Sequence, residues 1–155
     1  YAYVEPHNAK QRAKALELWN FTRDFTSKIP TRSFPILCTD ANGRVGSVLS
    51  SSIGRLNPAK ENFNGSCLRN LLEYHHMAAV NTFYPNPPTY YGSMGTTSRI
   101  DYIGIPISLL PNVHSSNVLE RAGDLLQHIC ARGRRDHRPV QVSFRHRLIY
   151  TSEHS

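Results

Sequence analysis

The run FPILCTDAN, residues 34–42, joins a short apolar segment to a carboxylate and a carboxamide. Its apolar half predicts a buried strand in which Cys38 belongs to the core. Side chains two residues apart point the same way from an extended segment, so Asp40 and Asn42 would project together. Asp40 could orient or deprotonate a water, and the Asn42 amide could donate to a phosphate oxygen. Taken alone, Asp-x-Asn-Gly is more typical of a turn.

Two further clusters place polar groups at the ends of apolar runs. The segment RIDYIGI, residues 99–105, predicts a strand near Asp101, where a charge is costly unless it is hydrogen-bonded. The segment DHRPV, residues 136–140, leads into a last apolar strand. His137 is a natural partner for Asp101, because a carboxylate fixes the tautomer of an imidazole. His137 could protonate a leaving oxygen or stabilise a pentacovalent phosphate, and Asp136 could face a metal or the attacking water. Asp101 could instead pair with Arg99 or cap a hairpin.

Strands and helices are expected to alternate around these clusters. Helical periodicity runs from Ala9 to about Ser27, with Asn8 as a cap, and a Leu-rich helix should follow Asn64-Gly65-Ser66. Residues 41–60 should form a long loop, and a turn at residues 92–97 should join a hairpin. Strands are expected at residues 1–5, 34–38, 79–84, 89–91, 99–105, 113–119 and 139–148. This order predicts an α+β fold with one mixed sheet and two helices covering one face.

Length and composition narrow the class of protein. A chain of 155 residues favours one domain, and no apolar run approaches the roughly 20 residues that span a membrane. The net charge of +7 weakly favours a polyanionic partner. Arginines crowd residues 132–147, where they would attract phosphates or form a solvated basic face. Three cysteines without CxxC spacing indicate neither a disulfide framework nor a zinc site. They favour an intracellular compartment, with the nucleus as one candidate location.

Taken together, the three clusters resemble the endonuclease/exonuclease/phosphatase superfamily of metal-dependent phosphoesterases. The Gly-Asp-x-Asn, Ile/Leu-Asp-Tyr and Ser-Asp-His segments of that family are matched by residues 39–42, 99–103 and 135–139. Thr39 and Arg135 replace the usual Gly and Ser, and Tyr3 matches the tyrosine of the family's Tyr-x-Pro strand. Residues 64–65, 81–83 and 88–90 are most similar to the endonuclease domains of non-LTR retrotransposons and of craniofacial development protein 2-like proteins.

The resemblance implies a DNase I-like αββα sandwich of four layers. Residues 1–148 would be its C-terminal portion, with one sheet and two covering helices, and residues 149–155 would be a tail. The N-terminal half, which carries the family's metal-binding Glu, would be missing. Without that half, one face of the sheet would expose an apolar surface. We expect this surface to be larger than the few hundred Å² that a soluble monomer usually tolerates.

The resemblance also implies Mg2+- or Mn2+-dependent hydrolysis of a phosphodiester in DNA. Asp40 would activate the water, Asn42 would hold the phosphate, Asp101 would orient His137, and Asp136 would lie near the metal. The Tyr3 phenol would contact the scissile phosphate. Without the Glu ligand, metal binding should be weak and catalysis by this chain impaired.

DNA is the partner that these expectations favour. Candidate nucleic-acid contacts are Tyr90, Arg99, Arg134, Arg135 and Arg138, although ordinary strand packing explains Tyr90 and Arg99 as well. A reverse transcriptase domain could belong to the same polypeptide. Two alternatives stay open. The fold could act on phosphomonoesters or phospholipid head groups, or the chain could be an inactive fragment that binds nucleic acid or a protein partner.

Overall fold

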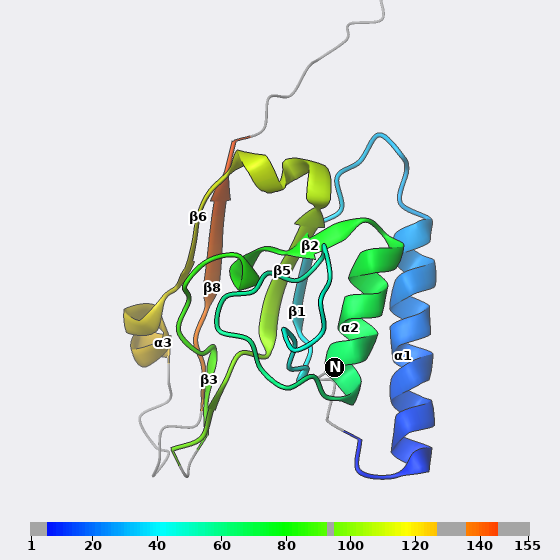
Figure 1. Ribbon diagram of the computed structural model, residues 1–155, viewed down its shortest axis with the longest axis horizontal. Coiled ribbons are helices and arrows are strands. Elements are labelled where there is room, and N and C mark those ends of the chain that lie inside the picture. The colour runs from blue at the N-terminus through cyan, green and yellow to red at the C-terminus, as the bar shows by residue number, and fades with distance from the viewer. Residues whose placement is uncertain (1–5, 93–94, 127–135, 146–155) are drawn as a thin grey trace, which may run out of the picture.

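A computed structural model of the chain describes residues 6–92, 95–126 and 136–145, apart from the side chains of Asp124 and Asp136 (Figure 1). The described residues form three α-helices, α1 (Ala9–Ser27), α2 (Phe63–Tyr74) and α3 (Glu120–Leu126). They also form two 3-10 helices, η1 (Val80–Thr82) and η2 (Ile107–Asn112). The strands there are β1 (Leu37–Asp40), β2 (Met77–Ala79), β3 (Tyr90–Tyr91), β4 (Thr97–Ser98), β5 (Asp101–Pro106), β6 (Val113–Val118), β7 (Asp136–His137) and β8 (Val140–Phe144). None of the described helices has the length and apolar character needed to cross a bilayer.

In the described part of the chain, the strands form three small antiparallel sheets. The first has β5 between β1 and β2, the second has β3 between β4 and β7, and the third pairs β6 with β8. The prediction of one mixed sheet is therefore wrong in detail. Pro139 has no N–H to donate to a ladder, and it separates β7 from β8, which belong to different sheets. In Figure 1, β8 nevertheless runs beside β5.

The two long helices form layers beside the first sheet. Figure 1 shows α2 next to the sheet and α1 outside α2, and α1 packs on α2. Gly104 on β5 permits the close approach, because a Cβ there would lie 3.0 Å from the Leu72 Cδ2 of α2. The predicted bounds of α1 are confirmed. The α2 helix begins at Phe63, which is earlier than predicted, since Asn62 and not a later residue is its cap.

Two apolar cores follow from this packing. The larger lies between α2, the long loop and the first sheet, and its buried members are Trp19, Ala41, Val45, Ile53, Leu68, Leu71, Leu72, Met77, Ala79 and Tyr102. The smaller contains Val80, Ile105 and Leu109. Cys38 is exposed, contrary to the prediction, because its neighbours Leu37 and Thr39 take the more buried positions in β1. Phe25 on α1 is 62% exposed, although its apolar side chain contributes to the helical periodicity of residues 9–27.

Residues 79–84 were predicted to form one strand, but they do not. Its alternation ends at Ala79, and the chain turns through η1 instead. Side-chain bonds to the backbone stabilise this turn: the Thr82 hydroxyl donates to Ala79 O at 2.6 Å, and Asn86 Nδ2 donates to Asn81 O at 3.3 Å. Such local bonds compete with a strand ladder. The strand near residues 113–119 is confirmed. A hairpin follows residues 89–91 as predicted, but its second strand is β4, because the expected partner segment forms β5 and pairs with β1 and β2 instead.

Candidate active site

Strand pairing brings three of the predicted residues to one place. Asp40 is the last residue of β1 and Asp101 the first of β5, and the two are opposite each other in the antiparallel register. His137 lies in β7, where it pairs with Tyr90 of β3. A hydrogen bond to Asp101 then joins the second sheet to the first. Residues from three distant segments therefore meet at the strand ends, as the sequence predicts.

The imidazole of His137 lies between the two carboxylates. Its Nδ1 is 3.0 Å from each carboxylate oxygen of Asp101, and its Nε2 is 3.8 Å from Oδ2 of Asp40. When Nδ1 carries the proton, it donates to Asp101, which leaves Nε2 facing Asp40. The 3.8 Å separation is too long for a hydrogen bond. An oxygen atom can therefore lie against both groups.

Burial sets the proton affinity of the inner carboxylate. The pKa of Asp101 is raised above its ordinary value, chiefly because burial disfavours the ionised form. Hydrogen bonds with Thr89 and His137 act in the opposite direction, and the nearby Asp40 adds to the increase. A carboxylate with a raised proton affinity is a strong acceptor for the Nδ1 proton. Asp101 is thus suited to hold the imidazole and not to contact solvent.

The three groups open into a pocket of about 370 Å³. Its walls come from β1, β5 and the β7–β8 segment: Cys38, Thr39, Asp40, Asp101, Tyr102, Ile103, His137, Arg138, Pro139 and Val140. Asp40 and His137 are 30% and 40% exposed, so both can reach a bound molecule. A second hollow of about 290 Å³ lies between α1 and α2 and contains no carboxylate. The chemistry of the described residues is therefore concentrated at the strand ends.

Two buried residues that sequence reasoning assigned no role hold Asp101 in place. The Thr89 hydroxyl accepts from the backbone N–H groups of Ile100 and Asp101, at 3.0 and 3.1 Å. Asn81 Nδ2 donates to the Asp101 carbonyl at 2.9 Å. Both side chains are fully buried. Their only signal in the sequence is a polar residue beside apolar strand positions, which does not reveal the partner.

Two arginines proposed to contact nucleic acid are instead buried. Arg99 is 8% exposed and donates to the carbonyls of Asn81, Leu56 and Asn57 at 3.0–3.2 Å. Arg138 is 7% exposed, donates to the carbonyl of Glu120 and lies over the ring of Tyr91. Both guanidinium groups are engaged inside the protein, because they satisfy carbonyls of neighbouring segments. This placement corrects the expectation for Arg99 and Arg138.

The other predicted site residues lie beside the pocket, away from it, or outside the residues that the structure describes. The Tyr90 ring packs on the His137 imidazole, with centroids 5.0 Å apart. The Asn42 backbone N–H donates to Asp40 Oδ1 at 3.1 Å, but Asn42 does not line the pocket. Asp136 pairs with Tyr91 through its backbone, and its side chain lies outside the described atoms. Tyr3, Arg134 and Arg135 also lie outside the described residues.

The donor set of this cluster suits a metal only in part. One ligand atom each from Asp40, Asp101 and His137 lies within 4.8 Å of the others. Asp101 and Nδ1 of His137 are already bonded to each other, which leaves Asp40 as the carboxylate that faces the pocket. Mg2+ prefers oxygen ligands in octahedral geometry, whereas imidazole suits Zn2+ and similar ions. These residues alone therefore do not complete a Mg2+ site.

Solved nucleases share this arrangement of elements. A 3′ phosphatase, NExo from Neisseria bound to a product DNA hairpin, has a TM-score of 0.59 and 16% identity over 91% of this chain and 57% of its own. The 3′–5′ exonuclease NExo from Neisseria meningitidis has a TM-score of 0.60 and 17% identity over 90% of this chain and 57% of its own. The chain has the DNase I-like fold.

The similarity covers only part of these neighbours. The chain spans 57% of the length of each solved nuclease, which agrees with a partial DNase I-like domain. No family model matches the sequence, and no curated protein matches it. The resemblance to non-LTR retrotransposon endonucleases stays a prediction.

Proposed function

We propose that this chain carries part of an active site that hydrolyses phosphate esters in DNA. The observation that supports this most directly is the Asp101–His137–Asp40 arrangement, in which Nδ1 of the imidazole is hydrogen-bonded to Asp101 and Nε2 lies 3.8 Å from Oδ2 of Asp40. A base, an oriented imidazole and a pocket are the groups that acid–base hydrolysis requires. The DNase I-like fold supports the same reaction class.

The geometry favours one of the two roles that the sequence left open for His137. In-line displacement places the entering and leaving oxygens on opposite sides of the phosphorus. Two groups 3.8 Å apart cannot reach both ends, but they can contact the attacking water and a neighbouring phosphate oxygen. Asp40 would take the proton from the water as its oxygen attacks phosphorus. Protonated His137 would then stabilise the charge on the pentacovalent phosphate, with Asp101 supporting its cation. The bond from phosphorus to the leaving oxygen would break, and that oxygen would take a proton from solvent water.

A divalent metal belongs to this proposal, with most of its ligands outside the described residues. Asp40 is the described carboxylate best placed to contribute, and Asp136 is the second candidate. When bound, Mg2+ or Mn2+ would supply charge neutralisation on the phosphate. Because Mg2+ depends on a few well-placed carboxylates and the resemblance leaves the family's Glu ligand without a counterpart, we expect weak binding to this chain.

A phosphomonoester at a 3′ end is the second candidate substrate. One neighbour is named as a 3′ phosphatase and the other as a 3′–5′ exonuclease. One fold is therefore compatible with hydrolysis of a phosphomonoester and of a phosphodiester. Descent from a retroelement endonuclease and a covalently joined reverse transcriptase domain are the finer proposals, supported by the sequence resemblance alone. An inactive chain that binds DNA through the same pocket is the third candidate.

Two substrates and three variants test the proposal. Purified chain is incubated with Mg2+ and either supercoiled plasmid or a DNA hairpin with a 3′ phosphate. We expect His137→Ala and Asp40→Ala to lose about 10²- to 10⁴-fold in rate, as for removal of a general acid or base. His114→Ala is the matched control, because His114 is exposed on β6. Equal rates in all variants would reject the assigned roles.

The readouts also separate the three candidates. Nicking of the plasmid supports the endonuclease, whereas release of phosphate alone supports the 3′ phosphatase. Binding of the hairpin without turnover at any Mg2+ or Mn2+ concentration supports the inactive chain. Removal of the metal with EDTA should abolish either activity.

A further inference from the structure

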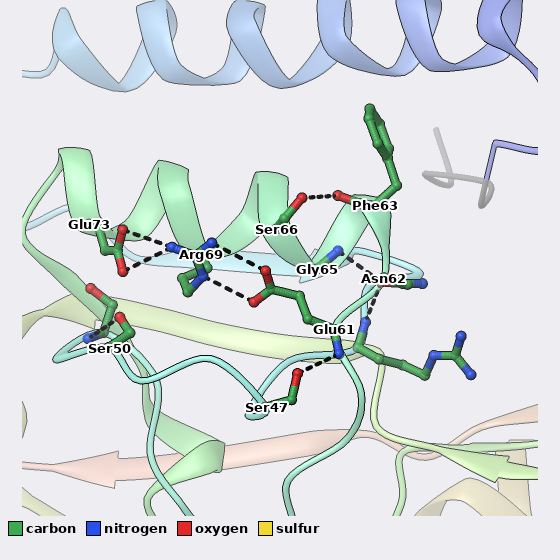
Figure 2. Close-up of polar contacts among 11 residues, drawn as sticks. Ser47, Ser50, Glu61, Asn62, Phe63, Gly65, Ser66, Arg69 and Glu73 are labelled. Carbon is green, nitrogen blue, oxygen red and sulfur yellow. Dashed lines mark hydrogen bonds and ion pairs between the residues drawn. The ribbon is translucent and has the colours of Figure 1, made fainter.

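The loop that carries Asp40 and Asn42 is fastened to the start of α2 by the side chain of Asn62. Its Oδ1 accepts from Gly65 N at 2.9 Å, which caps the helix, and from Arg44 N at 2.8 Å. Its Nδ2 donates to the carbonyl of Asn42 at 3.2 Å. Figure 2 shows Asn62 at the start of α2 beside Gly65. The Asn62 carboxamide thus bonds to the carbonyl of residue 42 and to the N–H of residue 44, at the two ends of this short segment.

Backbone packing leaves little room for movement at this contact. The Asn62 N–H also donates to the Arg44 carbonyl at 3.3 Å. A Cβ at Gly43 would lie 2.8 Å from Gly65 N, and a Cβ at Gly65 would clash with the Arg44 carbonyl at 1.9 Å. Both positions therefore require glycine, because the loop and the first turn of α2 are in direct backbone contact.

The clamped residues include one with a left-handed backbone conformation. Asn42 has a φ of 44°, in the region that asparagine tolerates better than most other non-glycine residues. The Asn42 N–H donates to the Asp40 carboxylate at 3.1 Å, so the same residue is bonded to the candidate site on its N-terminal side. Contacts lie on either side of this residue: its N–H bonds to Asp40, and its carbonyl accepts from the Asn62 amide. A substitution at Asn62 should therefore alter the position of Asp40.

We infer that Asn62 is a positioning residue, which holds Asn42 and Asp40 in the geometry of the candidate active site. It acts through the loop and does not touch the pocket itself. The effect on turnover rests on the proposed function, whereas the effect on the loop does not. Asn62 also caps α2, so an experiment must separate support of the loop from support of the helix.

Two substitutions at Asn62 make that separation. Asn62→Asp keeps the acceptor oxygen for Gly65 N and Arg44 N but replaces the donor to Asn42 with a second oxygen. An aspartate is also a good N-cap, so α2 should be retained. Asn62→Ala removes all three bonds. Asn8→Ala is the matched control, since Asn8 caps α1 with the same 2.9 Å bond, to Gln11 N.

Amide hydrogen exchange by NMR measures the loop directly. We expect the Asn42 amide to exchange on the order of tenfold faster in both Asn62 variants, and the Arg44 amide to do so only in Asn62→Ala. Thermal melting should show Asn62→Asp close to wild type, and Asn62→Ala close to Asn8→Ala. Unchanged exchange at Asn42 in Asn62→Asp would overturn the inference. So would equal acceleration at Asn42 in Asn8→Ala.

The kinetic readout tests the consequence for the site. If the wild type cleaves, kcat should fall about 10²-fold in Asn62→Asp, the size expected for an ångström of misplacement, with KM changed less than threefold. Asn8→Ala should keep wild-type kcat. A melting temperature and kcat both equal to wild type in Asn62→Asp would leave Asn62 with only its cap role. An inactive wild type would reject the proposed function, and the exchange rates would still decide the role of Asn62.

Discussion

Asp101 is the described residue in which folding and chemistry conflict most directly. Its carboxylate is 18% exposed and accepts from His137, and its burial raises its pKa. Thr89 and Asn81 fix its backbone, and turning the side chain toward solvent would break its hydrogen bond with His137. A charge held in this way is suited to supporting an imidazolium, but it costs the fold free energy.

The first expected outcome concerns the dependence of stability on pH. For an acid with a raised folded pKa, the folded state binds the proton more tightly than the unfolded state. Asp101 therefore favours folding below its ordinary pKa of 3.8, and this contribution is lost as pH rises through the folded value. Asp101→Asn should remove that loss. The melting temperature of the variant should rise relative to wild type as pH increases from about 3 to 7.

Differential scanning calorimetry of both proteins across this range checks the sign, because carboxylates distant from residue 101 contribute equally to both. A difference that does not vary with pH would contradict the buried charge. The same variant should lose at least 10²-fold in kcat, since the neutral amide supports the imidazolium less. A gain in stability with a loss of turnover distinguishes a catalytic carboxylate from a structural one.

Residue identity alone predicted part of this site. Asp40, Asp101 and His137 could be located because each follows or begins an apolar run, and strand ends gather at one edge. The burial of Arg99 could not be predicted, because its three acceptors come from residues 56, 57 and 81. Local sequence does not state which distant carbonyls lack a donor.

At the scale of elements, the long loop between β1 and α2 is held in place by an ion cluster. Arg69 on α2 binds Glu61 through two hydrogen bonds at 3.0 and 3.2 Å and Glu73 at 3.1 Å, as Figure 2 shows. The hydrogen bonding of Arg69 to the Glu61 carboxylate is the main reason that the pKa of Arg69 is raised. Ser47 adds a bond to Glu61 N at 2.8 Å. Loop and helix therefore form one unit.

We expect Arg69→Met to destabilise the protein by about 1 to 3 kcal/mol, because Glu61 would lose its cation while it is only 10% exposed. Glu73→Gln is the control, since Glu73 is 38% exposed and its pair should contribute about 0.5 kcal/mol or less. Urea unfolding followed by fluorescence measures both. Equal effects of the two substitutions would show that burial of Glu61 does not set the cost.

Element predictions succeeded where a local signal specifies the boundary. The α1 helix has a cap at Asn8 and helical periodicity up to Ser27, and both ends are found as predicted. The segment 79–84 alternates like a strand, but Asn81 and Thr82 are fully buried and bond to nearby backbone. Periodicity cannot distinguish a strand from such a turn, because the deciding bonds depend on the tertiary fold.

At the scale of the whole molecule, the chain is basic and exposes several large apolar side chains. The net charge is +7, and Phe21, Phe25, Leu49, Leu125 and Leu126 are each more than 60% exposed. The chain spans 57% of the length of its structural neighbours. The DNase I-like fold was inferred from motifs that each lie at a strand end, whereas the division into three sheets depends on contacts that no motif encodes.

Binding of duplex DNA should be steeply salt-dependent if the arginine-rich segment, residues 132–147, contacts phosphates. Each neutralised phosphate releases counterions and contributes about −0.9 to the slope of log K against log salt. With Arg99 and Arg138 buried, Arg134 and Arg135 are the arginines that remain among the proposed contacts. Their double substitution to alanine should reduce the magnitude of the slope by about 1.8, through the loss of two phosphate contacts.

Fluorescence anisotropy of a labelled duplex between 50 and 200 mM salt measures this slope, a range over which phosphate-binding proteins lose much of their affinity. The matched control is Lys28→Ala with Arg32→Ala, which removes the same charge from exposed positions at the C-terminal end of α1. An equal reduction in both double variants would show that net charge, and not the segment before His137, determines binding. A reduction confined to Arg134 and Arg135 would place the duplex beside the pocket, because β7 follows that segment directly.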